Sequence, residues 1–323
     1  YPITRVWCNK PTKVAKAEDI LISVRAPIGA MNYAKEKCCI GRGVAALTPN
    51  EEKVSSEFIF WLLKGKNNEL NQKGTGSTFK AIGRKVLEEI QVPEINLELQ
   101  RKYASNLERI YSIIQDRQRQ LEQLDKLVRA RFVEMFGDPV SNSYGLPEAT
   151  LPELGKFGRG VSKHRPRNDP RLLDGEYPLV QTDDVANASL YITSYNSTYS
   201  ELGLKQSKMW SKGTLCITIA ANIAKTAILE FDACFPDSVV GFIANEKTNN
   251  IFIHYWFSFF QAILESQAPE SAQKNINLKI LSELKVIVPE KEKQNEFVDF
   301  VHQVDKSKLQ YHPHTHTCRP NTS

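Results

Sequence analysis

The sequence predicts an α+β fold with two related domains, each a mixed β-sheet with short helices, separated by a long coiled-coil-type helix. One observation is a repeat: residues 19–61 align without a gap with residues 214–256. The separation is 195 residues, as from Cys39 to Cys234. A period of this length indicates a duplicated domain, because solenoid units span about 20–50 residues. The other observation is that residues 97–136, between the copies, contain neither proline nor glycine.

The first copy reads as short strands followed by short helices. An apolar strand is expected at residues 20–24 and a second at residues 44–47. Residues 51–63 have helical spacing. Beyond a turn rich in glycine and hydroxyl side chains, residues 82–90 fit a short helix that leads into a strand ending at Pro93.

Residues 97–136 are expected to form one helix, about 60 Å long at about 1.5 Å per residue. Gly137 and Pro139 follow it and stop it. Apolar residues recur at heptad spacing, with Arg117 and Arg131 in two positions of the same seam. The apolar seam consists of Leu107, Ile110, Ile114, Leu121, Leu124, Val128 and Met135.

The second copy is longer than the first at its N-terminal side. Residues 146–195 have no counterpart, because Tyr1 would align with Asn196. The first copy is therefore expected to lack roughly the opening 50 residues of a domain of ordinary size. The predicted boundaries are 1–96 for a partial first domain, 97–138 for the spacer helix, 146–289 for the second domain, 290–309 for a second, shortened helix and 310–323 for a disordered tail.

Composition limits the functional class. A net charge of +5 permits nucleic-acid binding without requiring it. No apolar run reaches the roughly 18 residues of a membrane span, and no signal peptide is visible. Six cysteines without a CxxC pair predict neither zinc site nor disulfide framework, so we expect a reduced, cytoplasmic protein. A metal site at His312, His314, His316 and Cys318 is less favoured than a disordered or frameshifted tail, because no predicted element holds them together.

Catalytic signatures are weak in this sequence. It contains no Asn/Asp-Pro-Pro-aromatic tetrad and no Walker loop. We therefore expect a chain that binds and positions, with no catalytic residue, no metal and no cofactor of its own.

Several of these segments together resemble the specificity subunit of Type I restriction–modification enzymes. Residues 127–138 (LVRARFVEMFGD) resemble the family's signature at the end of the helix, and residues 21–29 (LISVRAPIG) resemble its repeated strand. Residues 157–185 are similar to the opening of a target recognition domain. The resemblance covers nearly the whole chain up to Leu309.

The resemblance implies a function and partners. In that family two target recognition domains each bind one half of a bipartite double-stranded DNA sequence, while long helices set their separation and dock methyltransferase subunits. It implies methyltransferase subunits that use S-adenosylmethionine and a restriction subunit that uses ATP and Mg²⁺, with none of these ligands on this chain. The two helices are expected to pair antiparallel, so a shortened second helix would leave part of the first helix's apolar seam exposed.

The strongest candidate DNA contacts follow residue 157. DNA affinity comes mostly from phosphates and specificity from base edges. Glycine lets the backbone approach a phosphate, a serine can donate to one, and arginine can contact guanine with two hydrogen bonds. The candidates are Arg159, Ser162, Lys163, Arg165 and Arg167, with Asp169 as the single nearby acid. A solvated basic loop is the alternative.

Three weaker groups complete the candidates. A turn entering a helix carries Ser77, Thr78, Lys80 and Lys85, which suits phosphate binding. Its counterpart in the second copy carries Lys274 together with Asn275 and Asn277, and the amides of the two asparagines could read adenine. Helix capping explains such side chains equally well. Arg25, Gln181 and Thr182 stand at strand ends, where they could contact DNA or serve the fold alone.

Two other functions fit parts of the sequence. The chain could be a coiled-coil adaptor that binds protein partners without DNA readout, although the basic loops argue mildly against this. It could also be a stand-alone nuclease, which would cleave plasmid DNA with Mg²⁺ and no partner.

Overall fold

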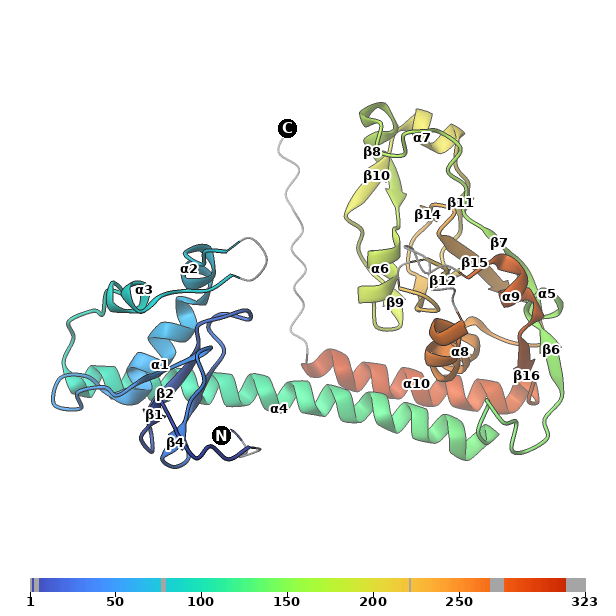
Figure 1. Ribbon diagram of the computed structural model, residues 1–323. Helices are drawn as coiled ribbons and strands as arrows, with labels where there is room; N and C mark the ends of the chain where they lie inside the picture. The colour runs from blue at the N-terminus through green and yellow to red at the C-terminus, as the bar shows by residue number, and fades with distance from the viewer. Residues whose placement is uncertain (1, 3–5, 77–79, 221, 268–275, 312–323) are drawn as a thin grey trace. The chain divides into compact units, whose positions relative to one another are not determined.

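The protein is seen in a computed structural model that describes residues 2, 6–76, 80–220, 222–267 and 276–311 (Figure 1). The chain divides into two compact units, residues 1–119 and 120–323. Each unit contains a β-sheet and helices around its own hydrophobic core, which confirms the predicted α+β class. Among the described helices, none is both long and apolar enough to cross a membrane.

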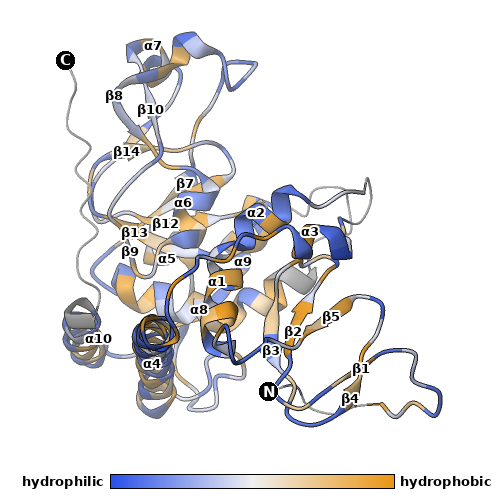
Figure 2. Ribbon diagram, turned by 90° about the vertical axis from the view of Figure 1, so that its left-hand side faces the viewer, coloured by the Kyte–Doolittle hydropathy of each residue, from blue (hydrophilic) through white to orange (hydrophobic). Residues whose placement is uncertain are grey.

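The first unit is built on a three-stranded antiparallel sheet with the order β3-β2-β5. Its strands are β1 (Val14–Ala15), β2 (Ile20–Ser23), β3 (Met31–Tyr33), β4 (Cys38–Cys39) and β5 (Val44–Leu47). Its helices are α1 (Ser56–Gly65), α2 (Asn67–Gln72), α3 (Arg84–Glu88) and the first part of α4 (Leu97–Phe136). Figure 2 shows β2 in the orange of apolar residues and α3 in the blue of polar ones.

Most of the elements expected in this unit form, and one does not. Helix α1 begins later than predicted, because the Ser55 side chain accepts a hydrogen bond from the backbone N–H of Phe58 and caps it. The strand expected before Pro93 is absent from the described structure, which is a correction. Its counterpart in the second unit, β16, pairs with β6 from residues 146–195, and no described segment of the first unit takes the place of β6. Val92 is accordingly 42% exposed.

The second unit has a five-stranded sheet of order β7-β15-β12-β13-β9, a four-stranded sheet of order β10-β8-β14-β11 and the pair β16-β6. Its strands are β6 (Glu148–Thr150), β7 (Gly155–Arg159), β8 (Leu173–Leu179), β9 (Tyr191–Ile192), β10 (Ser197–Tyr199), β11 (Met209–Trp210), β12 (Leu215–Thr218), β13 (Thr226–Leu229), β14 (Ala233–Cys234), β15 (Val239–Ala244) and β16 (Lys285–Ile287). Its helices are α5 (Leu151–Leu154), the 3₁₀ turn η1 (Pro170–Leu172), α6 (Thr182–Asn187), α7 (Glu201–Lys205), α8 (Asn250–Gln267), α9 (Leu278–Glu283) and α10 (Lys291–Tyr311).

The repeat seen in the sequence is a repeat of strand register. Ile20 lies opposite Leu47 in the first unit, and Leu215 lies opposite Phe242 in the second, 195 residues further on in each case. The pairing of β2 with β3 matches that of β12 with β13 in the same way. In the second unit β7 and β9 extend the sheet at its two edges, and both strands come from the segment without a counterpart.

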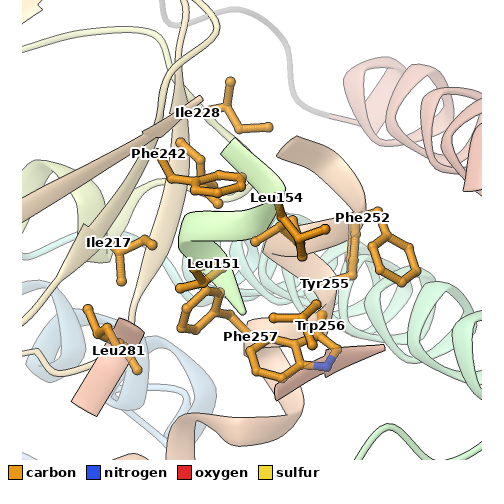
Figure 3. Packing of buried hydrophobic residues seen from close by; sticks show 14 of the residues in the cluster. Leu151, Leu154, Ile217, Ile228, Phe242, Phe252, Tyr255, Trp256, Phe257 and Leu281 are labelled. Carbon is orange, nitrogen blue, oxygen red and sulfur yellow. The ribbon is translucent and has the colours of Figure 1, made fainter. Parts of the chain in front are cut away.

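The main core of the second unit lies between the five-stranded sheet and α8. Leu151 and Leu154 of α5 are fully buried there, in one cluster with Phe242 of the sheet and with Phe252 and Trp256 of α8 (Figure 3). The short helix α5 forms because the hydroxyl and backbone N–H of Thr150 and the side chain of Glu153 make a capping box. The aromatic residues of α8 are therefore core residues.

Helix α10 packs against the part of α4 that belongs to the same unit (Figures 1 and 2). The ring of Phe297 on α10 lies 5.3 Å from that of Phe132 and 5.7 Å from that of Phe136. Further along, the Lys308 ammonium on α10 lies near Asp125 on α4, so the two helices run antiparallel, as the resemblance implies.

The seam of α4 is buried in its second half and exposed in its first. Val128 is fully buried, Leu124 packs against the core and Leu121 is half-buried. On the first half, apolar side chains face solvent, and we call them the exposed stripe. It consists of Tyr103, Leu107, Ile110, Ile113 and Ile114, which are 48%, 43%, 55%, 59% and 58% exposed.

Candidate nucleic-acid interface

The basic loop of the second unit, residues 158–172, leaves the edge strand β7 and passes close to the turn between β14 and β15. Gly160 makes this passage possible. Its backbone N–H donates to the carbonyl oxygen of Val239 at 2.8 Å. A Cβ atom at Gly160 would collide with the carbonyl oxygens of Phe235 and Pro236, so the sequence requires a glycine at this point.

The loop is held in one conformation by hydrogen bonds to Gln206 and Ser207 and by an ion pair between two of its own residues. The backbone N–H of His164 donates to Gln206 at 3.0 Å, and the Ser207 hydroxyl donates to the carbonyl oxygen of Val161 at 2.7 Å. Asp169, which is largely buried, accepts from the Arg171 guanidinium at 2.7 Å. The Arg171 side chain and backbone N–H keep the pKa of Asp169 well below its usual range, so this carboxylate stays ionised.

Arg165 and Arg167 share one carboxylate. The Arg167 guanidinium lies 2.7 Å from Asp237, and that of Arg165 lies 3.7 Å from it. Their side chains remain 56% and 48% exposed. The expectation that Asp169 is the only acid near this stretch is wrong, because the fold brings Asp237 to it from 70 residues away in the sequence.

The other candidates of this loop differ in accessibility. Arg159 and Lys163 are exposed and make no ion pair with any described residue. Ser162 is only 7% exposed, so its hydroxyl is poorly placed to reach a phosphate. The exposed basic groups of the loop are therefore Arg159, Lys163, Arg165, Arg167 and Arg171.

Two of the weaker candidates cap helices. Gln181 caps α6: its backbone N–H donates to Asp184 at 2.8 Å, and its side-chain amide donates to Ser197 at 3.0 Å. Thr182, the next residue, is half-buried. The Asn277 side chain accepts from the backbone N–H of Ile280 at 2.9 Å and so caps α9. Lys274 and Asn275 lie outside the described residues.

The first unit presents a smaller basic surface. Arg25 and Lys80 are exposed and lie on neighbouring segments, because the N–H of Ala26 donates to the carbonyl oxygen of Lys80 at 3.2 Å. Neither makes an ion pair with a described residue. Lys85 of α3 lies 3.8 Å from Glu89, so its charge is partly balanced. Ser77 and Thr78 lie outside the described residues.

One basic residue of the first unit was missed in the sequence. Arg42 stands in the turn between β4 and β5, at the position that the repeat aligns with Asp237. It is exposed, and no described carboxylate lies within ion-pair distance of it. The signal that could have found it is the alignment of the two copies, which places an arginine where the second unit has an aspartate.

Comparison with known proteins gives the family. The family described as "Type I restriction modification DNA specificity domain" matches residues 9–124 and 148–314. The chain belongs to this family. These two matches correspond to the two copies of the repeat.

Members of the specificity-subunit family are similar to this chain over different lengths. The putative type I restriction enzyme MjaX specificity subunit of Methanocaldococcus jannaschii is 44% identical over 126 residues, which are 39% of this chain and 30% of that protein. The EcoBI specificity subunit of Escherichia coli is 22% identical over 317 residues, which are 89% of this chain and 66% of that protein. The chain thus spans less than a third of the first relative and about two thirds of the second.

A solved specificity subunit has the same fold. The S subunit of the type I restriction–modification system of M. genitalium superposes with a TM-score of 0.57 at 17% identity, over 92% of this chain and 78% of that one. The family's named members are specificity subunits and not catalytic ones. The described residues contain no group of three or more His, Cys, Asp or Glu side chains that could hold a metal ion.

Proposed function

We propose that this protein is the DNA-reading subunit of a type I restriction–modification complex. It binds double-stranded DNA with a bipartite target, one half-site for each unit, and directs methylation and cleavage that partner subunits carry out. Family membership supports this proposal. The observation that carries it is the basic loop of the second unit, where five exposed basic side chains stand on a segment fixed by hydrogen bonds to its own domain.

The loop has the chemistry of a DNA contact. Its arginines can donate two parallel hydrogen bonds to phosphate or to the O6 and N7 atoms of guanine. Because the hydrogen bonds of Asp169, Gln206 and Ser207 fix the loop, little conformational entropy is lost when it binds. Arg159 and Lys163 have no competing carboxylate among the described residues, so we assign them to phosphates.

The first unit would contact the other half-site through Arg25, Arg42 and Lys80. We also propose phosphate or base contacts at positions that the two copies share in the sequence, namely Ser77, Thr78, Lys85, Lys274, Asn275 and Asn277. Gln181 and Thr182 belong to the same proposed surface of the second unit. Asn277 caps α9 through its side-chain oxygen, so its NH₂ group can still face DNA, whereas both groups of the Gln181 amide are engaged within the fold.

The proposed partners are methyltransferase subunits, which would dock on the helices, and a restriction subunit. The exposed stripe on α4 offers such a partner an apolar surface with basic and acidic residues beside it. The chain itself would supply neither S-adenosylmethionine nor ATP chemistry. In this proposal the partner subunits catalyse methylation and cleavage.

Binding to duplex DNA tests the proposal. Fluorescence anisotropy of a labelled random duplex is measured against the full chain, alone and with its methyltransferase subunit, over a salt series. Arg159→Ala with Lys163→Ala should weaken binding and reduce the slope of log K against log salt by about one to two, since each phosphate contact contributes about 0.9. Lys293→Ala, an exposed residue of α10, is the matched control.

The same experiment separates the alternatives. A chain that binds its protein partner but no duplex at low salt would be an adaptor. Cleavage of plasmid DNA by the purified chain with Mg²⁺ and no partner would make it a nuclease. Either result would end the proposal that this chain reads DNA for other subunits.

A further inference from the structure

Asp237 lies beside the basic loop and contacts two of its arginines. It stands in the turn between β14 and β15, and the backbone N–H of Val239 donates to the carbonyl oxygen of Pro236 at 3.0 Å to close that turn. Its side chain is 33% exposed and faces Arg165 and Arg167. No other described side chain lies within ion-pair distance of it. Among the described residues, Asp237 therefore restrains just the two arginines that are proposed to meet DNA.

The contact fixes the direction of both guanidinium groups. Arg165 donates from Nη1 to the carbonyl oxygens of Ser162 and His164, at 2.6 and 2.8 Å, while its Nη2 faces Asp237. Arg167 approaches both Asp237 oxygens, at 2.7 and 2.9 Å. A long side chain that would otherwise sample many rotamers is held in one arrangement in each case.

The contact also lowers the positive charge of the surface. Two guanidinium groups and one carboxylate leave a net charge of one instead of two at this place. Ion pairs that are half exposed to water are weak, so the contact lowers the affinity of the two arginines for phosphate without abolishing it. A phosphate of random DNA must compete with Asp237 for each arginine. Base edges that match the fixed guanidinium directions need no such rearrangement.

The first unit differs from the second at this position. The repeat places Arg42 where the second unit has Asp237, within an otherwise equivalent turn that leads into β5 or β15. The fold therefore accepts either charge at this turn. The aspartate is a property of the second unit's surface and not a requirement of the sheet.

We propose that Asp237 is a specificity-determining positioning residue, which orients Arg165 and Arg167 for base reading and suppresses sequence-independent phosphate binding by the loop. This inference rests on the proposed DNA-reading function. Asp237, which is remote in sequence, would thus control how Arg165 and Arg167 contact DNA.

The test compares Asp237→Asn with the wild-type full chain and with Asp299→Asn, an exposed carboxylate on α10 that makes no ion pair with a described residue. Affinity for a random duplex is measured by anisotropy between about 50 and 200 mM salt. One additional phosphate contact changes affinity about threefold over this range. Asp237→Asn should therefore bind random duplex more tightly, with a gain that grows about threefold as salt falls, while Asp299→Asn should not.

Selectivity is the second readout. Duplexes selected from a random pool by the wild-type chain with its methyltransferase subunit are compared with unselected duplexes. The ratio of the affinity for selected duplexes to that for unselected ones should fall at least about threefold in Asp237→Asn. The substitution strengthens binding to unselected duplexes but not to the selected ones. In a background that carries Arg165→Ala and Arg167→Ala, Asp237→Asn should have no further effect on either measurement.

In the DNA measurements, an unchanged salt slope, an unchanged affinity ratio, or an equal effect of Asp237→Asn in the background without the two arginines would overturn the inference. Retention on heparin gives the comparison without DNA, since the variant should elute at higher salt than the wild type and Asp299→Asn. Equal elution overturns the role of Asp237 whatever the chain does with DNA. A wild-type chain that fails to bind duplex, with the heparin shift present, would overturn the proposed function and the base-reading role of Asp237, but not its restraint of anion binding by the two arginines.

Discussion

The ammonium group of Lys308 lies 2.7 Å from the carboxylate of Asp125 and links α10 to α4. Lys308 also lies 3.3 Å from Asp305 of its own helix. Asp125 is 63% exposed, so this ion pair contributes little free energy. The antiparallel arrangement of the two helices depends instead on the buried rings near their other ends.

Phe132→Ala should destabilise the second unit by about 3–5 kcal/mol, because the fully buried ring packs against Phe136, Phe252 and Phe297 and its removal leaves a cavity. Asp125→Asn, the control, should cost less than about 1 kcal/mol. Urea denaturation of both variants measures the difference. Similar losses in the two would mean that the ion pair, and not the rings, holds these helices.

Gly160→Ala should cost about 1–3 kcal/mol in stability, because the added Cβ must displace the backbone carbonyls of Phe235 and Pro236. Gly65→Ala is the matched control, since that helical position has open space around it and alanine favours a helix. Thermal unfolding compares the two. An unchanged melting temperature for Gly160→Ala would show that the loop can leave the β14–β15 turn at no cost.

Gln294→Leu should destabilise the protein by about 1–3 kcal/mol. The fully buried Gln294 amide donates to the carbonyl oxygens of Lys247 and Pro289, at 2.9 and 2.8 Å, and its carbonyl accepts from Thr248. Leucine would leave these buried groups without partners. Gln303→Leu, on the exposed side of the same helix, should change the unfolding free energy by less than about 0.5 kcal/mol in the same denaturant titration.

Ile110→Gln should leave the stability of the free chain within about 0.5 kcal/mol, because this side chain is 55% exposed. If a methyltransferase subunit docks on the exposed stripe, the same change should weaken that complex about tenfold, since a buried apolar anchor would be lost. Titration calorimetry with the methyltransferase subunit measures the affinity of each protein for it, with Glu122→Gln as the control. Equal affinities for all three proteins would place the docking surface elsewhere.

Stability should fall in mildly acidic solution because of His254. Its ring lies 2.9 Å from the Thr226 hydroxyl, and burial lowers the pKa of His254 to about 4 in the folded protein. The unfolded chain has an ordinary histidine pKa of about 6.5 and binds a proton first as pH falls. The part of the stability that depends on His254 is therefore highest above about pH 6.5 and decreases toward pH 4. His254→Gln should flatten the melting temperature between pH 7.5 and 5; an unchanged slope would assign the effect to other groups.

Patterns of local spacing predicted the secondary structure well. Helix α4 begins at Leu97 and ends at Phe136, because a stretch without proline or glycine ends at Gly137, which has a positive φ of 76°. The strands that contain Ile20 and Val44 formed for the same local reason. The strand before Pro93 did not form, because a strand needs a second strand to pair with. Local spacing does not reveal whether such a partner is available.

The candidate site was harder to predict, because its polar partners come from distant parts of the chain. The basic residues from Arg159 to Arg167 stand out as a cluster in the sequence, and the structure keeps most of them exposed. Nothing near them in the sequence points to Asp237 or to Gln206. Ser162 is buried by the tertiary fold, and the local sequence shows a hydroxyl side chain without showing its burial.

The two sheets share one strand register, so the turn between β4 and β5 and the turn between β14 and β15 join their strands in the same way. We expect that residues 41–43 can be grafted onto positions 236–238, and the reverse, with the strand register kept on either side. Chimaeras of this kind would move a local charge from one half of the molecule to the other while leaving each scaffold as it is.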